Sequence, residues 1–194
     1  MTRVARTRTK IAAELAHARG SLRPLRIFRK SADGGPYDAF VLSLGSRWVL
    51  LQPITQRLDL DGYACLRIQD LASVEHYPQA ELLSTVFRAR RIRPRRRPID
   101  LSSTPQLLAS AQRMAGLLVI ERNTRYPGEV EVGHIVEFKR AACKILTVSI
   151  HVEIDGEEEI RFADVTAVSF ENGYEEGLNV IAKFEKRSRP RSAT

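Results

Sequence analysis

The stretch Asp61-Gly-Tyr-Ala-Cys-Leu-Arg-Ile-Gln-Asp-Leu-Ala-Ser-Val74 recurs 94 residues later as Asp155-Gly-Glu-Glu-Glu-Ile-Arg-Phe-Ala-Asp-Val-Thr-Ala-Val168. Both copies follow the pattern D-G-x-x-x-h-R-h-x-D-h-x-x-V, in which h is an apolar residue. Upstream, residues 40–44 face 134–138 and residues 16–19 face 110–113 at the same offset. A tandem duplication explains these collinear matches better than chance does, so we expect one structural unit to occur twice.

Each copy opens with a segment typical of an amphipathic helix, at residues 6–19 and 105–115. Ser103 or Thr104 is expected to cap the second helix, with Pro105 in its first turn. A further apolar stripe predicts a helix at residues 78–91, which either packs on its own unit or docks a partner. In the second copy, short β-rich segments follow the helix at residues 117–122, 132–138, 144–154, 158–162 and 165–170.

The Asp-Gly pairs at 61–62 and 155–156 predict two-residue hairpin turns, because both central positions of such a turn need a positive φ. Alternation along the strand that follows places Arg67 and Cys65 on its outward face. The recurring aspartates Asp70 and Asp164 are expected to accept hydrogen bonds from turn amides before the last strand.

About five short strands behind one helix bury a core best by curling into a small barrel. We therefore predict a mainly β fold with α-helices, built as two tandem helix-plus-five-stranded small β-barrels. The expected segments are a basic N-terminal helix (1–20), the first barrel (21–87), an arginine-rich linker (88–103), the second helix and barrel (104–184) and a basic tail (185–194).

This pattern resembles the small β-barrels of the Sm-like and SH3-like class. Leu66-Arg67 and Ile160-Arg161 match the start of the second Sm motif, whereas Ile68 and Phe162 replace its glycine and Asp70 and Asp164 its asparagine. These departures fall where Sm proteins contact RNA. Trp48-Val49-Leu50 is similar to the WYL ligand-sensing domains of bacterial regulators, and Leu60–Tyr63 resembles the LDGY motif of a group of bacterial proteins.

Composition predicts a folded protein: 43% of the 194 residues are apolar and 28% are charged. No apolar run approaches the twenty or so residues that cross a bilayer, so no membrane partner is expected. The two cysteines have no pairing spacing, and no signal-peptide core follows the basic N-terminus, which favours a cytoplasmic location.

Basic charge gathers in one half of the chain. Residues 1–97 hold 19 Lys and Arg against 8 Asp and Glu, a balance of +11, whereas residues 98–194 hold 12 against 15, a balance of −3. Such a field attracts polyanions, so any polyanion site is expected within residues 1–97. The acidic strand edge at 157–159 is expected either to pack on basic surface of the first unit or to recruit a different partner.

Known catalytic signatures are missing. The sequence has no Gly-rich phosphate or dinucleotide loop and no nucleophile elbow. Its four histidines lack metal-ligand spacing, and an EF-hand alignment on Gly62 places Arg57 and Ile68 at ligand positions. Cys65 has no histidine to activate it. We expect no enzyme, no cofactor and no metal.

The leading hypothesis is a nucleic-acid-associated or regulatory protein whose arginines contact phosphate, with RNA or DNA as the partner. The candidate residues are Arg67, Arg88, Arg90, Arg91, Arg93, Arg95, Arg96 and Arg97. Aromatic residues for base stacking, such as Tyr63, are sparse. The alternative is a protein-interaction or small-ligand-sensing module, with a protein partner or a homo-oligomer and only a solvated arginine linker.

Overall fold

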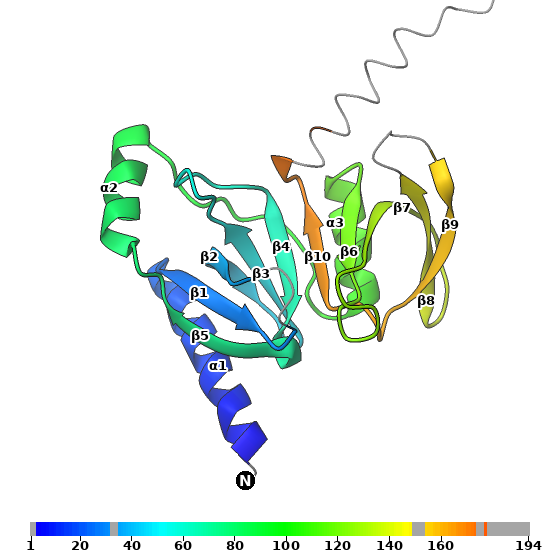
Figure 1. Ribbon diagram of the computed structural model, residues 1–194, viewed down its shortest axis with the longest axis horizontal. Coiled ribbons are helices and arrows are strands. Elements are labelled where there is room, and N and C mark those ends of the chain that lie inside the picture. Colours follow the sequence, from blue (N-terminus) through cyan, green and yellow to red (C-terminus); the bar gives the residue numbers. More distant parts are fainter. Residues whose placement is uncertain (1–2, 32–34, 149–153, 174–176, 178–194) are drawn as a thin grey trace, which may run out of the picture.

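A computed structural model describes residues 3–31, 35–148, 154–173 and 177 of the chain. These described residues form three named α-helices, ten strands and one short 3-10 turn (Figure 1). The first half holds α1 (Arg3–Ser21), β1 (Pro24–Arg29), β2 (Tyr37–Leu44), β3 (Trp48–Pro53), β4 (Tyr63–Arg67), the turn Ile68–Asp70, β5 (Leu71–His76) and α2 (Ala80–Arg90). The second half holds α3 (Thr104–Met114), β6 (Leu118–Glu121), β7 (Val130–Phe138), β8 (Ala142–Val148), β9 (Ile154–Arg161) and β10 (Ala167–Phe170).

The three helices lie where their sequence signals place them. Ser103 is the N-cap of α3, and its hydroxyl accepts a hydrogen bond from the backbone N–H of Gln106 at 3.4 Å. This contact satisfies one of the amides that a helix N-terminus leaves without a partner. In the described part of the chain, none of the helices has the length and apolar character needed to span a membrane.

All ten strands form one antiparallel sheet in the order β5-β1-β2-β3-β4-β10-β6-β7-β8-β9. The mainly β composition with α-helices is confirmed, but the prediction of two closed barrels is wrong. β4 pairs with β10 of the other half, with Leu66 opposite Ala167 and Tyr63 opposite Phe170. Because this edge is satisfied across the junction, neither half closes on itself. We call the β4·β10 junction the seam.

Within each half the strands lie in the same spatial order: fifth, first, second, third, fourth. Arg67 lies opposite Trp48, and Arg161 lies opposite Ala142, which is the same pairing 94 residues later. The irregularity between Val41 and Ser43 recurs between Ile135 and Glu137. Only the first strand of the unit departs from this correspondence. Pro24 pairs with Phe40, so the 94-residue offset predicts His134 opposite Leu118, but Leu118 lies opposite Gly133.

Neither Asp-Gly pair forms the expected two-residue hairpin. Gly156 lies inside β9 and pairs with Thr147 of β8. Gly62 ends a longer connection between β3 and β4, in which Ile54 bridges to Leu60. Its φ is +50°, and an added Cβ would lie 2.6 Å from the backbone of Glu171 and Asn172. The glycine is therefore needed for a close approach at the seam.

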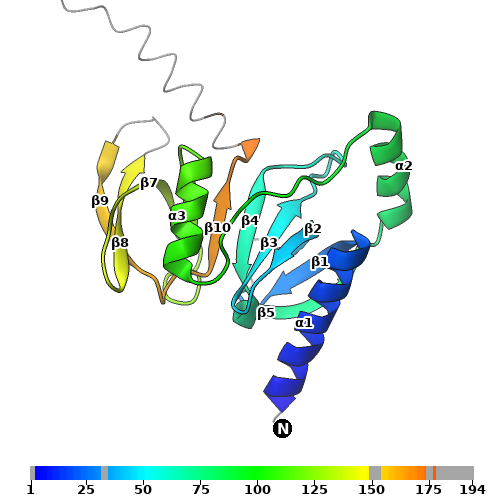
Figure 2. The same cartoon turned by 180° about the vertical axis from the view of Figure 1, so that it is seen from behind.

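The core has two parts. One cluster lies between α1, through Ile11, Leu15 and Ala18, and one face of the first half of the sheet. The other runs through both halves and includes residues of α2, of the segment that follows it, and of α3. Figure 2 shows α1 and α3 from the side that Figure 1 hides, with the α2–α3 connection crossing the sheet.

β4 is therefore covered on both faces. Leu66 packs in the α1 cluster, while Cys65 is fully buried in the larger one. The prediction that Cys65 points outward is wrong, because the face that alternation assigned to solvent is part of the larger core cluster, which also includes Ile99 and Leu101. At the aligned positions of β9, Glu157 and Glu159 are exposed, whereas Tyr63 and Cys65 are buried. Because the β9 positions are exposed, they can carry glutamates where β4 has buried uncharged residues. This accounts for part of the difference in net charge between the halves.

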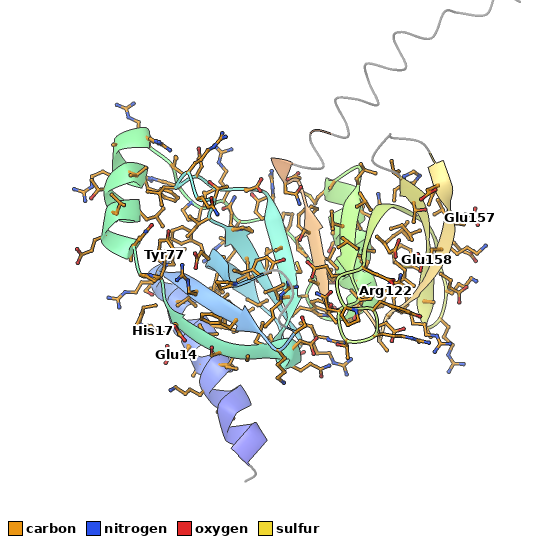
Figure 3. The ribbon with its side chains drawn as sticks, viewed as in Figure 1. Glu14, His17, Tyr77, Arg122, Glu157 and Glu158 are labelled. Carbon is orange, nitrogen blue, oxygen red and sulfur yellow. The ribbon has the colours of Figure 1, made fainter. Side chains whose placement is uncertain are left out.

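The acidic edge of the second half does not pack on the first. β9 is the last strand of the sheet, separated from β4 by β10, β6, β7 and β8. Figure 3 shows Glu157 and Glu158 at the end of the molecule opposite Glu14 and His17 of α1. Instead, Glu157 lies 3.4 Å from Lys144, and Glu159 pairs with Lys139. The packing alternative is therefore wrong, and recruitment of a separate partner stays a prediction.

Candidate anion-binding cleft

The arginine segment, residues 88–97, is held against the sheet rather than suspended as a linker. Arg91 ends α2 with a left-handed φ of +57°, and the next amide, that of Ile92, donates to the Phe87 carbonyl at 2.9 Å. The amide of Arg95 donates to Oε1 of Gln52 on β3 at 2.8 Å. Further along, Ile99 and Leu101 are buried in the core. These contacts fix the backbone of the segment and therefore the positions from which the arginine side chains extend.

A cleft of about 730 Å³ opens beside this segment, and we call it the arginine cleft. Five of the predicted site residues line it, namely Arg90, Arg91, Arg93, Arg95 and Arg97. The other walls are Gln52, Leu60, Gly62 and Tyr63 of the first half, residues 114–117 after α3, and Glu171 after β10. Both halves therefore supply the lining, so this cleft extends beyond residues 1–97, where a polyanion site was expected. Glu171 is the single carboxylate among these lining residues.

Three of the five guanidinium groups have no partner within the described part of the chain. Among the described residues, the side chains of Arg91, Arg93 and Arg95 make no hydrogen bond or ion pair. Arg90 donates to the Arg57 carbonyl at 3.3 Å and lies 3.9 Å from Asp59. Guanidinium groups bind phosphate and carboxylate oxygens through paired N–H donors, so the unpaired three are available to an anion.

Arg97 has a more enclosed position. Its Nη2 lies 2.9 Å from Oε2 of Glu171, and its guanidinium lies 5.3 Å from the centroid of the Tyr63 ring. Burial opposes the charged form, but the hydrogen bond to Glu171 and the charges of Tyr63 and Glu171 raise the pKa of Arg97 overall. Its buried Nε has no hydrogen-bond partner among the described residues. The Tyr63 ring also stacks on Phe170, with ring centroids 5.4 Å apart.

The structure does not bring the remaining predicted residues into this cleft. Arg88 and Arg96 are exposed but are not part of its lining. Arg67 pairs with Asp70 and donates to the Ala163 carbonyl at 2.6 Å and to Thr124 Oγ1 at 3.3 Å. Arg67 therefore ties the two halves together, and Asp70 accepts from its side chain. Asp164 likewise accepts from a side chain, that of Arg125 at 3.2 Å.

Sequence reasoning missed Gln52 and Glu171. A single glutamine in an apolar strand is a weak signal of a functional site. In the structure, the Gln52 side chain is buried, with 6% of its surface exposed. Nothing local marks Glu171, because it reaches Arg97 only through the pairing of β10 with β4.

The cysteines are poor nucleophiles. Burial raises the pKa of the Cys65 thiol, and burial together with the charge of Glu159 raises that of Cys143 to about 11. Both thiols are therefore protonated near neutral pH. In the parts of the chain that the structure describes, no three His, Cys, Asp or Glu side chains gather in a way that could hold a metal ion.

A second polar group, the seam cluster of Arg29, Tyr37, Glu121 and Asn123, joins the halves away from the cleft. Glu121 pairs with Arg29, and it accepts hydrogen bonds from the Tyr37 hydroxyl at 3.2 Å and the Asn123 amide at 2.6 Å. Burial and the Glu121 charge raise the pKa of Tyr37 to about 12. Arg29 and Tyr37 come from the first half, whereas the acceptor comes from the second.

The second half holds a buried charge group of its own. Arg122 lies 2.5 Å from Glu131 and 2.7 Å from Glu158, and its guanidinium lies 4.5 Å from the centroid of the Tyr126 ring (Figure 3). Burial, and then the hydrogen bond and charge of Glu158, raise the pKa of Glu131 above 4.5, against the opposing effect of Arg122.

The raised pKa of Glu131 predicts a pH dependence of stability. Because the folded protein binds this proton more tightly than the unfolded chain, the group favours folding increasingly as pH falls through its folded pKa, an effect complete below about 4.5. The free energy of unfolding of the wild type, relative to that of Glu131→Gln, should therefore rise as pH is lowered from 7 towards 4.5. Urea unfolding at several pH values measures this difference. A difference that stays constant or falls would contradict the assignment.

Comparisons with known proteins identify no family. No protein-family model and no curated protein matches the chain. A solved structure with some likeness is that of YcgR in complex with c-di-GMP from Escherichia coli, at 11% sequence identity and a TM-score of 0.20. The match covers 94% of this chain and 92% of that chain. At that identity and TM-score the likeness carries no argument about this protein.

Proposed function

We propose that this chain is a non-enzymatic binding module that holds a small phosphorylated molecule in the arginine cleft. The observation that carries the proposal is the convergence of five arginines, from a segment anchored by Gln52, on one cleft with a single carboxylate. Anchoring lowers the entropic cost of binding, because the donors are partly ordered before the ligand arrives. Phosphate oxygens suit the paired N–H donors of guanidinium groups.

Two features favour a small ligand over a nucleic acid. The volume of about 730 Å³ lies within the range of about 300–1,000 Å³ that is usual for small-molecule sites. The aromatic side chain in the lining, Tyr63, is only 4% exposed and contacts both Phe170 and Arg97, so its ring is not open to a base. Sequence-tolerant binding of single strands relies on such stacking. Charge is therefore the main basis of recognition in this proposal.

The test compares two probes on the full chain. Tripolyphosphate and a single-stranded 20-nucleotide DNA are titrated into the wild type and into Arg91→Ala/Arg93→Ala/Arg95→Ala. We expect the wild type to bind tripolyphosphate and the triple variant to lose at least about 30-fold in affinity, since three phosphate-facing cations disappear. Calorimetry gives the dissociation constants.

The matched control removes three exposed arginines that do not line the cleft, in Arg113→Ala/Arg140→Ala/Arg161→Ala. It lowers the net charge equally and should change the affinity less than about threefold, because exposed charges are screened by salt. Equal losses of tripolyphosphate affinity in both triple variants would show that only net charge matters. That result would contradict binding in the arginine cleft. Tighter binding of the DNA, with a steep salt dependence carried by the arginine segment, would favour the nucleic-acid hypothesis instead.

We also infer that the two halves derive from one duplicated unit. The shared strand order, the recurrent pairing of Arg67 and Arg161, and the recurrent irregularity in the β2–β3 and β7–β8 ladders support this origin. If so, the cleft arose after the duplication, because its lining comes from both halves.

A further inference from the structure

Glu171 is the carboxylate of the arginine cleft, and it engages Arg97. Its Oε2 lies 2.9 Å from Nη2 of Arg97, and the two side chains are 27% and 36% exposed. The pair is therefore partly shielded from solvent but remains open on the cleft side, where both residues form the lining. An entering anion meets a site in which two of the five cations already have a counter-charge: Arg97 from Glu171 and, at 3.9 Å, Arg90 from Asp59.

The backbone holds this carboxylate in place. Glu171 directly follows β10, whose last residue, Phe170, pairs with Tyr63 of β4. It has a φ of +55°, a left-handed conformation that is uncommon for a residue with a side chain. Its backbone lies against Gly62, and two residues later the amide of Gly173 donates to Asp61 at 2.8 Å. These contacts fix the position from which the Glu171 side chain reaches Arg97.

Arg97 retains capacity for a second acceptor. Its side chain is 36% exposed, with Nη2 engaged by Glu171, whereas Nε is buried and out of reach of an entering anion. A guanidinium binds an oxyanion best when two of its N–H groups donate together, as a fork. Such binding at Arg97 is in direct competition with Glu171, because the carboxylate already uses one of the terminal donors.

We propose that Glu171 is an internal competitor that occupies Arg97 when the cleft is empty and yields it to a phosphate group of the ligand. The proposal rests on the proposed function of the cleft and adds its regulation. The carboxylate lowers the affinity for every anion. It thereby favours ligands with several phosphate groups, which engage the three unpaired arginines as well as Arg97.

The experiment titrates tripolyphosphate and inorganic phosphate into the wild type, Glu171→Gln and Glu171→Asp. The amide keeps the size of the side chain and removes its charge, so we expect about tenfold tighter binding of tripolyphosphate, as removal of a like charge a few ångströms from the ligand predicts. The affinity for inorganic phosphate should increase by at least the same factor. Glu171→Gln should therefore prefer tripolyphosphate over inorganic phosphate less strongly than the wild type does. Glu171→Asp keeps the charge and should stay within about twofold of the wild type.

The control is Glu159→Gln, which makes the same charge change at an exposed position on β9, outside the cleft. It should leave affinity unchanged within about twofold. Circular dichroism and thermal unfolding establish that every variant is folded. Equal tightening in Glu171→Gln and Glu171→Asp would trace the effect to loosened structure and overturn the competitor role.

The outcomes separate the two proposals. If the wild type binds tripolyphosphate and the Arg91/Arg93/Arg95 variant does not, but Glu171→Gln equals the wild type, the cleft function stands and the competitor role is wrong. If Glu171→Gln binds and the wild type does not, the competitor role is supported in its strongest form. If neither binds, both proposals are overturned.

Discussion

Replacement of Glu121 by alanine is expected to lower the free energy of unfolding by about 3 kcal/mol, because breaking a buried ion pair leaves charge and hydrogen-bonding groups poorly compensated. The Arg29 and Glu121 side chains are only 9% and 14% exposed. The same carboxylate accepts from Tyr37 and Asn123, so its removal deprives several donors of an acceptor at once. Urea unfolding of the full chain, followed by circular dichroism, measures the loss.

The control for this prediction is Glu159→Ala, whose carboxylate is 51% exposed and pairs with Lys139. An exposed pair of this kind contributes about 0–1 kcal/mol. The double variant Arg29→Met/Glu121→Leu should recover part of the loss, since it removes both charges and keeps apolar volume. A loss of less than 1 kcal/mol in Glu121→Ala would mean that the seam cluster contributes little to the association of the halves.

The substitution Gly62→Ala is expected to cost about 2–4 kcal/mol, made up of left-handed backbone strain and overlap with the chain after β10. The added Cβ would lie 2.6 Å from backbone atoms of Glu171 and Asn172, which cannot move away as a flexible side chain would. The shift should also disturb Glu171 and therefore the arginine cleft. Urea unfolding measures the stability, and tripolyphosphate titration measures the effect on the cleft.

The aligned glycine provides a matched control. Gly156 also has a positive φ, +145°, but an added Cβ there meets nothing within 4 Å. Gly156→Ala should therefore show the cost of backbone strain alone, about 1–3 kcal/mol. Tripolyphosphate affinity should be unchanged in Gly156→Ala. Equal losses of stability in both variants, with equal effects on the cleft, would contradict a specific close approach at the seam.

Local features were predictable where short-range physics decides them. Ser103 and Pro105 mark the start of α3 because capping and ring geometry act within one turn. The recurring motif places Arg67 and Arg161 at equivalent register positions, since side chains on a strand alternate with a period of two. The concentration of arginines at residues 88–97 is likewise visible in the sequence, and five of them line one cleft.

Predictions failed where pairing and packing beyond the local pattern decide the environment. Asp155-Gly156 has the composition of a tight turn, yet Gly156 pairs with Thr147 of the neighbouring strand β8 inside the ladder. Alternation assigns Cys65 to the outward face together with Arg67, but Cys65 is buried in the larger core cluster. Local propensities are worth about 1 kcal/mol or less, and the burial of a strand face outweighs them.

The amino-acid sequence by itself determined the helices, the repeated register of the strands and the density of positive charge. Only the tertiary structure decided that β4 pairs with β10, and hence that two halves form one sheet instead of two barrels. That pairing joins residues about a hundred positions apart, and it brings Glu171 to Arg97 and the end of α3 to the arginine segment. No local pattern encodes such contacts, because an unpaired strand edge is satisfied equally by its own unit or by the next, and the packing of the whole core selects between them.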